Sequence, residues 1–476
     1  MIENKPFVHL FRTPGGYYIY DVNKNMIIKT QQSIWEKIRN VQAGTCDFGN
    51  ENNLIAKMSE DGFLSSNRIK EIVHPADDIL MYYLNRKIIM ITLQVTQQCN
   101  LRCDYCVYSG GYENRGHSRK SMDFEMAKKC IDFYIEHSVD SDLINIGFYG
   151  GEPLVEFELI KKCISYVESI SEGKELMFTM TTNGTLLKEE IVRFLEEHGV
   201  VIRISLDGPK EIHDRSRKFA FNNCGSFDKI IENINMIKEK FPEYYKKLAF
   251  STVLDQKNDL SCISQFFTDF ETVKDVSLFA AEIVDNYAKN TVDETEDFRC
   301  KIGYEHFKVL LSKVTSFDEK YISKIVAYDY ENLGRIYKHL QATEALPERT
   351  HPGGPCIPGI QRLFVNVDGN MFPCERVNES SEVTKIGNIN EGFDLGKIRA
   401  LLNIGRLSED KCKNCWAFRF CTLCCTSADT GDGLSGDKRN SRCRRVRDAA
   451  EYDLKDICTL KENNFDFDFS NWFILA

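Results

Sequence analysis

The chain has 476 residues, of which 42% are hydrophobic and 28% charged, and this length suggests about three domains with sizeable cores. A net charge of −10 argues against nucleic acid as a partner, because phosphate binding needs a basic surface. No early apolar segment has the form of a signal peptide, and no run is long enough to span a membrane. We therefore expect a cytoplasmic protein with no membrane partner. In a reducing compartment, 18 cysteines indicate metal ligation rather than disulfides where they cluster.

Residues 1–80 combine short strands with helices. Residues 7–11, 16–22 and 26–29 have strand-like patterns, the last two separated by a turn at 23–25, and a helix is expected to about residue 41. This arrangement resembles the small winged-helix elements of peptide-modifying enzymes, which bind a leader peptide by adding its strand to a sheet edge. The alternative is a plain structural layer, and the residues leave both open.

From residue 86 to 284, strands and helices alternate. The expected strands are 88–95, 143–149, 176–182, 200–206, 248–254 and 276–282, and the expected helices are 124–137, 157–170, 188–198, 227–240 and 260–270. Such alternation predicts an α/β fold with a parallel sheet and crossover helices. Strand counting alone leaves open whether the sheet is a partial barrel or doubly wound.

Three cysteines follow the first of these strands. Cys99, Cys103 and Cys106 lie in the loop at its C-terminal end, where ligands of α/β folds are expected. Three thiolates can hold an iron–sulfur cluster, with the fourth iron bound by a distant residue or left open. A structural zinc site or a reduced triplet of thiols is the alternative.

The spacing C-x3-C-x2-C, with Tyr105 before the last cysteine, resembles the signature of the radical S-adenosylmethionine (SAM) enzymes. The resemblance implies that the three cysteines hold a catalytic [4Fe-4S] cluster whose open iron binds SAM. It also implies that residues 86–284 form a partial (β/α)6 barrel.

Further motifs follow at successive strand ends. The candidates for SAM binding, with Tyr105, are Gly150, Gly151, Glu152 and Pro153 after the second strand, Thr182 and Asn183 after the third, and Ser205, Asp207 and Arg217 after the fourth. By resemblance, the GGEP stretch contacts the SAM amino group, and the later residues contact the ribose and carboxylate. Each of these stretches alone could also be an ordinary turn. The occurrence of all of them at successive strand ends supports the radical SAM interpretation.

A motif-free helical bridge, 285–350, separates the barrel from a second cysteine-rich region, 351–450. The cysteines there are Cys356, Cys374, Cys412, Cys415, Cys421, Cys424, Cys425 and Cys443. Their spacing resembles the SPASM extension of radical SAM peptide and protein modifiers. The resemblance implies one auxiliary cluster on Cys412, Cys415, Cys421 and Cys443, and another on Cys356, Cys374 and Cys425. A zinc ribbon on Cys412, Cys415, Cys421 and Cys424 is the alternative, and the sequence does not decide between Cys424 and Cys425.

Two details of this region lead to further expectations. No cysteine lies between Cys356 and Cys374, where sulfatase maturases carry a ligand, so we hypothesise an iron that is open to a substrate thiolate. The basic residues flanking Cys443 are Lys438, Arg439, Arg442, Arg444, Arg445 and Arg447. We interpret them as a solvated helix face; balancing cluster charge or contacting an acidic leader are alternatives. The tail, 451–476, is assigned no function.

Together these features predict a radical SAM maturase with three [4Fe-4S] clusters. Its expected substrate is a small cysteine-containing precursor peptide with a leader, and its expected electron donor is a flavodoxin or ferredoxin. By resemblance to sactipeptide and ranthipeptide maturases, the expected reaction forms a thioether between a cysteine sulfur and a carbon. Another SPASM-type reaction, such as carbon–carbon crosslinking or formylglycine formation, is the alternative. A further alternative is a non-enzymatic iron–sulfur or zinc protein.

Overall fold

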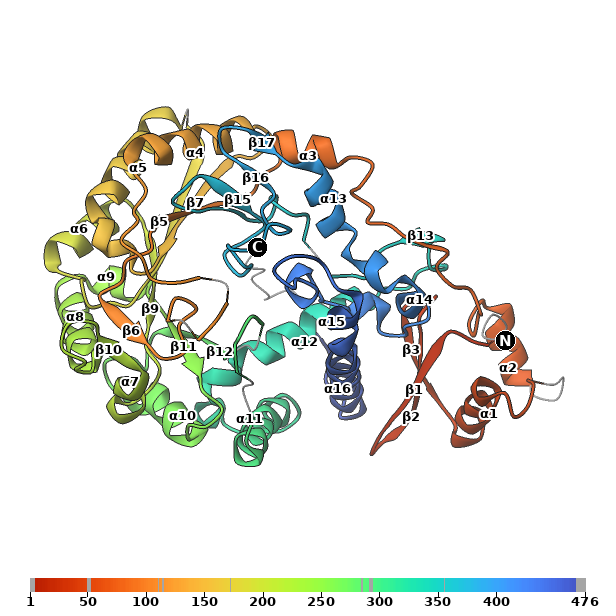
Figure 1. Ribbon diagram of the computed structural model, residues 1–476. Coiled ribbons are helices and arrows are strands. Elements are labelled where there is room, and N and C mark those ends of the chain that lie inside the picture. Colours follow the sequence, from red (N-terminus) through yellow and green to blue (C-terminus); the bar gives the residue numbers. More distant parts are fainter. Residues whose placement is uncertain are drawn as a thin grey trace.

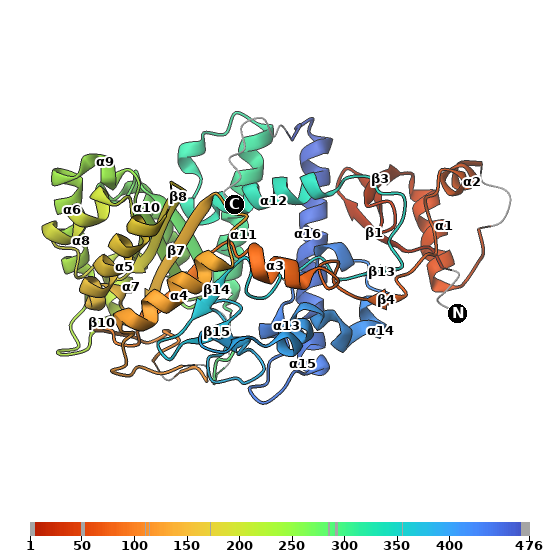
Figure 2. The same cartoon turned by 90° about the horizontal axis from the view of Figure 1, so that it is seen from above.

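The computed structural model describes residues 5–48, 53–109, 111–113, 115–171, 173–283, 286–290, 294–354 and 356–467. The parallel-sheet half lies at one end of the molecule and the N-terminal sheet at the other, with the long helix α16 (Cys443–Glu462) between them (Figures 1 and 2). In the described part of the chain, no helix is both long enough and apolar enough to cross a membrane.

Six parallel strands form the expected partial barrel. In spatial order they are β12 (Ser277–Glu282), β11 (Ala249–Leu254), β9 (Val201–Ser205), β8 (Glu175–Thr182), β7 (Leu143–Gly150) and β5 (Ile91–Thr96). The crossover helices are α4 (Phe124–Glu136), α5 (Phe157–Ile170), α6 (Glu189–Glu197), α8 (Phe227–Lys240) and α10 (Leu260–Asp269). They cover the outer face of the curved sheet (Figure 1). The predicted α/β class and parallel topology are confirmed.

Local chemistry explains why these helices begin and pack where they do. The Asp123 side chain caps α4 by accepting from the backbone N–H of Met126. The buried residues of α4 are Ala127, Cys130, Ile131 and Tyr134, which recur at helical spacing on one face. Cys130 is therefore a small core residue.

The barrel sheet continues into the C-terminal region. Strand β14 (Leu363–Val365) pairs in parallel with β5, and β15 (Asn370–Phe372), β16 (Gly387–Asn388) and β17 (Gly392–Phe393) follow in antiparallel order. The ten strands form one sheet. The segment that follows Cys356 is thus hydrogen-bonded to the strand that leads to the first three cysteines.

The N-terminal unit is an antiparallel sheet with two helices. Its elements are β1 (Val8–Thr13), β2 (Gly16–Asp21), β3 (Met26–Thr30), α1 (Gln32–Ala43) and α2 (Asn53–Glu60). One side of this sheet shares a hydrophobic core with the C-terminal region, in which Phe11 and Tyr20 cluster with Cys412, Phe418 and Leu454. The winged-helix interpretation stays a prediction, but the unit is not a detached module.

The remaining elements complete the two halves. They are β4 (Glu71–Ile72) paired with β13 (Arg349–Thr350), α3 (Leu80–Arg86), β6 (Leu101–Cys103) paired with β10 (Arg217–Phe219), α7 (Lys210–Ser216), α9 (Pro242–Tyr245), α11 (Glu296–Val314), α12 (Ala327–His339), α13 (Leu395–Leu402), α14 (Glu409–Cys412) and α15 (Gly436–Ser441). Helix α16 continues through residue 450, where the expected C-terminal tail begins. The Phe467 ring stacks on Tyr337 at 4.3 Å, and residues 468–476 lie outside the described part.

Candidate functional site

The three cysteines of the first motif lie in the loop after β5, at the C-terminal edge of the barrel sheet. A short antiparallel ladder between β6 and β10 holds the middle of the loop, which includes Cys103. The backbone N–H of Leu101 donates to Cys99 Sγ at 3.3 Å, and that of Tyr108 donates to Cys106 Sγ at 3.5 Å. Such hydrogen bonds favour the thiolate, the form of cysteine that binds iron.

Burial governs the protonation of these three thiols. Burial raises the pKa of Cys99 and of Cys103 to about 12, and burial also raises the pKa of Cys106. Cys99 interacts electrostatically with the other two thiols. Three buried sulfurs become thiolates together only when a positive centre such as iron compensates their charge.

Two glycines let the end of β7 approach the cysteine loop. A Cβ on Gly150 would lie 2.1 Å from the Thr96 carbonyl oxygen, and one on Gly151 would lie 2.2 Å from that of Gln98. Gly150 also has a φ of 151°, which side chains rarely adopt. The glycines are therefore required by the backbone contact with the loop itself.

Glu152 joins three strand ends beneath the loop. Its buried carboxylate accepts from the Thr182 hydroxyl at 2.7 Å, from the Asn183 backbone N–H at 2.7 Å and from the Leu154 backbone N–H at 3.1 Å. Burial raises its pKa, and these three hydrogen bonds oppose that shift. The Asn183 amide in turn lies 3.9 Å from Cys99 Sγ, so β8 contacts the cysteine loop directly.

Asp207 and Arg217 form a buried ion pair beside the loop. The Asp207 carboxylate accepts from Arg217 Nε at 2.8 Å and from the Val253 backbone N–H at 3.2 Å, and it also binds the Tyr105 hydroxyl. Burial alone would raise the pKa of Asp207, but the Arg217 charge and the hydrogen bonds from Arg217 and Tyr105 together hold it below the ordinary value. Tyr105 and Arg217 thus anchor the loop to the end of β9.

The structure brings the predicted SAM-binding residues to one edge of the sheet. Pro153 opens a 3-10 helix after β7, and Ser205 ends β9. Their role in binding SAM stays a prediction, because the contacts above are contacts within the protein.

A buried histidine beside this edge gives a testable pH dependence. His213 Nδ1 accepts from the Asp207 backbone N–H at 3.3 Å, its Nε2 lies 3.0 Å from the Ser226 hydroxyl, and burial lowers its pKa to about 3. Unfolded histidine binds a proton near pH 6.5. The free energy of unfolding therefore falls as pH drops below that value, by about 2 kcal/mol between pH 6.5 and 5 for this residue.

Urea unfolding at several pH values measures how the free energy of unfolding depends on pH. In His213→Gln this dependence should decrease by the contribution of one proton. An identical slope in the variant and the wild type would contradict the assignment.

Four cysteines of the C-terminal region form one set. Cys412, Cys415, Cys421 and Cys443 line a single cavity, and their thiols interact electrostatically. Cys412 ends α14 and Cys443 begins α16. This is the group that the SPASM resemblance implies for one auxiliary cluster.

The other four cysteines form a second set, which includes both members of the adjacent pair. The Cys424 thiol shares a hydrogen bond with Cys425 and interacts electrostatically with Cys356 and Cys374. The hydrogen bond with Cys425 holds the pKa of Cys424 below its ordinary value. This grouping favours the implied auxiliary sets over the zinc-ribbon alternative, which needs Cys424 beside Cys412. Whether Cys424 or Cys425 is a ligand stays a prediction.

In the described residues, no three or more His, Cys, Asp or Glu side chains are arranged to hold one metal ion. Each thiolate of a cubane cluster binds a different iron, and the assignment of these thiols to clusters stays a prediction.

A second buried ion pair, which sequence reasoning missed, connects the two cysteine-rich regions. Arg115 Nε lies 2.8 Å from the Glu379 carboxylate, and both side chains are at most 8% exposed. Gln94 on β5 donates to Glu379 at 3.0 Å and to the Tyr108 hydroxyl at 2.9 Å. The segment that follows Cys374 is thereby fixed against the first cysteine loop. Arg115 and Glu379 are far apart in the chain, so no local sequence pattern indicates that they form an ion pair.

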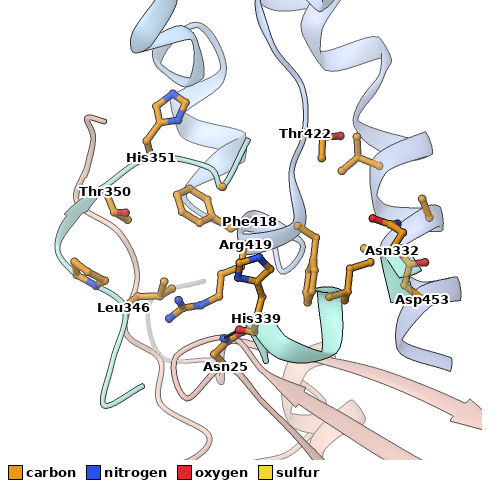
Figure 3. Close-up of a pocket in the computed structure, with 17 residues that line it drawn as sticks. Asn25, Asn332, His339, Leu346, Thr350, His351, Phe418, Arg419, Thr422 and Asp453 are labelled. Carbon is orange, nitrogen blue, oxygen red and sulfur yellow. Dashed lines mark hydrogen bonds between the residues drawn. The ribbon is translucent and has the colours of Figure 1, made fainter. Parts of the chain in front are cut away.

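The largest cavity described, about 650 Å³, contains none of the predicted site residues. It lies between α12, α16 and the loop around Phe418, with Asn25 of the N-terminal unit at its edge (Figure 3). Arg419 in its wall donates from Nε to the Val22 carbonyl at 3.1 Å, and so attaches the C-terminal region to the N-terminal sheet.

Comparison with known proteins agrees with this geometry. Residues 93–261 match the radical SAM superfamily. The cysteine-type anaerobic sulfatase-maturating enzyme of Clostridium novyi (strain NT) is 24% identical over 386 residues, 77% of this chain and 96% of that enzyme. The radical SAM cyclopropyl synthase TigE of Paramaledivibacter caminithermalis is 25% identical over 218 residues, 43% of this chain and 44% of that enzyme.

The solved structure of native anSMEcpe with bound AdoMet has a TM-score of 0.59 at 20% identity, covering 78% of this chain and 99% of that one. At 20% identity, this structural similarity shows that the two chains share a fold.

The chain therefore contains a radical SAM domain, which implies a [4Fe-4S] cluster and SAM as its cofactors. It is a radical SAM enzyme, homologous to the anaerobic sulfatase-maturating enzymes and to TigE.

Proposed function

We propose that this enzyme is a maturase that modifies a cysteine- or serine-containing peptide or protein by removing hydrogen from a side-chain carbon. The observation that carries the proposal is the grouping of cysteines: one three-thiol loop at the barrel edge and two four-thiol sets, connected through the pairing of β14 with β5. The names of its relatives support a protein substrate. An acidic flavodoxin or a ferredoxin is the proposed electron donor.

The protein residues would hold and orient the cofactors. Cys99, Cys103 and Cys106 would hold the first cluster, which with SAM supplies a 5′-deoxyadenosyl radical when both are bound. Gly150 and Gly151 keep the loop close to β7, and the contacts of Glu152 and Asp207 fix the strand ends around it. Rigid placement of this kind limits the radical to one substrate carbon.

Formylglycine formation, named above as an alternative, is now the better-supported reaction. Removal of two hydrogens from a cysteine side chain gives a thioaldehyde, and water then replaces sulfur to give the aldehyde and hydrogen sulfide. One hydrogen would leave as an atom, taken up by the 5′-deoxyadenosyl radical, and the other as a proton, so that a single electron would leave through the auxiliary clusters. The sulfatase-maturating relatives support this reaction, and so does the fourth thiol, Cys424, which would occupy the iron that a substrate thiolate would otherwise bind.

Thioether formation is the second candidate. The antiparallel sheet β1–β3 with its two helices supports it, because such a unit would suit recognition of a leader peptide by strand addition. Two hydrogens would again be lost, one from the peptide thiol and one from the attacked carbon, with a new sulfur–carbon bond.

Mass spectrometry separates the two reactions. The reconstituted enzyme is incubated anaerobically with SAM, a reductant and a peptide containing both cysteine and serine. An aldehyde that reacts with hydrazide supports formylglycine. Loss of two hydrogens, with the thiol protected from alkylation, supports a thioether. SAM cleavage with every peptide tested unchanged would contradict the maturase proposal.

The role of Cys424 can be tested by exposing an iron. If four thiolates saturate the cluster on Cys356, Cys374, Cys424 and Cys425, added cyanide should leave its electron paramagnetic resonance (EPR) signal unchanged in the wild type. In Cys424→Ala the vacant iron should bind cyanide and shift the signal. Cys262→Ala, at an exposed isolated thiol, is the control. A shift already present in the wild type, and equal in Cys424→Ala, would restore the open-iron hypothesis.

A further inference from the structure

Arg439 is a buried cation without an anionic partner. Its side chain is fully buried, the largest so buried in the described chain, although the sequence suggested a solvated basic face. Nε and Nη1 form no hydrogen bond. Among the described residues no carboxylate forms an ion pair with it. Burying an unpaired guanidinium is costly, so such a residue needs a compensating charge.

A cysteine sulfur is the polar atom that the Arg439 guanidinium contacts. Its Nη2 lies 4.0 Å from Cys421 Sγ, and its side chain lines the cavity that Cys412, Cys415, Cys421 and Cys443 also line. Its charge acts to lower the pKa of Cys412, against the effect of burial. Four thiolates around a [4Fe-4S] core carry a net negative charge, which would compensate the guanidinium.

The fold directs Arg439 inward. Helix α15 begins at Gly436, where a Cβ would lie 2.4 Å from the Leu407 carbonyl oxygen. The helix is therefore packed closely against the 3-10 helix Ile404–Ser408. The Ser435 hydroxyl caps α15 by accepting from Lys438 N–H. This docking leaves the side chain of Arg439 facing the cavity instead of solvent.

The neighbouring histidine cannot take over this charge. His351 Nε2 accepts from the Gly405 backbone N–H at 3.0 Å, and Nδ1 lies 2.9 Å from the Pro352 carbonyl oxygen. Burial, with smaller contributions from His74 and Arg439, lowers the pKa of His351 to about 4. His351 is therefore neutral. Lys411 and Arg447 also line the cavity, and Arg439 is the cation there whose side chain is fully buried.

We propose that Arg439 is the electrostatic partner of the auxiliary cluster on Cys412, Cys415, Cys421 and Cys443, donating toward its sulfurs and raising its reduction potential. The inference rests on the cluster assignment made under the proposed function. Reduction adds negative charge to a cluster, so a nearby cation and its hydrogen bonds stabilise the reduced state more than the oxidised state. Arg439 would thereby make this cluster a better electron acceptor.

The test is a redox titration of the reconstituted enzyme followed by EPR. In Arg439→Gln the potential of one auxiliary cluster should shift downward, while the potential of the SAM-binding cluster stays unchanged. Arg439→Lys keeps the charge and should shift the potential less. Arg444→Gln is the control, since the Arg444 side chain is 87% exposed and lies on the same helix as Cys443.

The outcomes separate failure of this inference from failure of the cluster assignment. If Cys412→Ala keeps the iron content and signals of the wild type, no cluster lies there and the assignment fails. If Arg439→Gln is fully loaded and keeps the wild-type potential, the inference is overturned. If the Gln variant loses the cluster and the Lys variant retains it, the required charge is demonstrated. Loss in both variants would indicate a packing role and overturn the inference.

Discussion

Replacing Cys103 with alanine is expected to abolish reductive cleavage of SAM and to remove one cluster, about four irons per chain. Cys103 lies in the part of the cysteine loop that the β6–β10 ladder holds, and its buried thiol interacts with the other groups of this site. Cleavage is measured as 5′-deoxyadenosine by liquid chromatography, and iron by colorimetric assay.

Two further variants sharpen this prediction. Cys300→Ala, at an exposed thiol on α11, should change neither quantity. Cys356→Ala should preserve SAM cleavage but abolish peptide modification, because it disturbs an auxiliary set only. Full cleavage activity in Cys103→Ala would show that the first cluster is bound elsewhere.

Asp207→Asn is expected to lower the free energy of unfolding by about 3–5 kcal/mol, because it leaves the Arg217 charge buried without a partner. Both side chains of this pair are at most 8% exposed. Asp207 also binds the Tyr105 hydroxyl, so the cysteine loop should loosen as well. Urea unfolding of the wild type and the variant at the same pH measures the loss.

The matched control is a surface ion pair on the same side of the barrel. Asp228 pairs with Lys210, and its side chain is 75% exposed. Asp228→Asn should therefore cost less than about 1 kcal/mol. Equal losses in the two variants would mean that the Asp207 pair contributes no more than an exposed one.

The elements that were predicted correctly are those with local signatures. The strand and helix periods around residues 88–282 gave the parallel sheet, and Cys99, Cys103 and Cys106 identify the loop because they are close in the chain. Gly150 and Gly151 were named as candidates for SAM binding, and the structure places them at the same edge, where they let β7 approach the cysteine loop closely.

The features that the sequence did not reveal depend on long-range docking. Arg115 and Glu379 meet only because β14 joins β5. Arg439 lies in a basic run that is typical of a surface. Its side chain points inward because α15 packs against the 3-10 helix that contains Leu407. Likewise, Cys424 joins Cys356 through the fold, a grouping that the sequence left open.

The core shared by the N-terminal sheet and Cys412 has a thermodynamic consequence. Tyr20 and Phe11 pack in the same cluster as a cysteine that we assign to an auxiliary cluster. Iron loading at that cysteine should therefore slow amide hydrogen exchange in β1–β3. It should also raise the affinity of the sheet for a peptide. By reciprocity, a peptide bound to the sheet should then raise the affinity of the site for iron by the same factor. An iron-starved chain would then release its substrate as well as lose its chemistry, which would protect the peptide from a half-assembled enzyme.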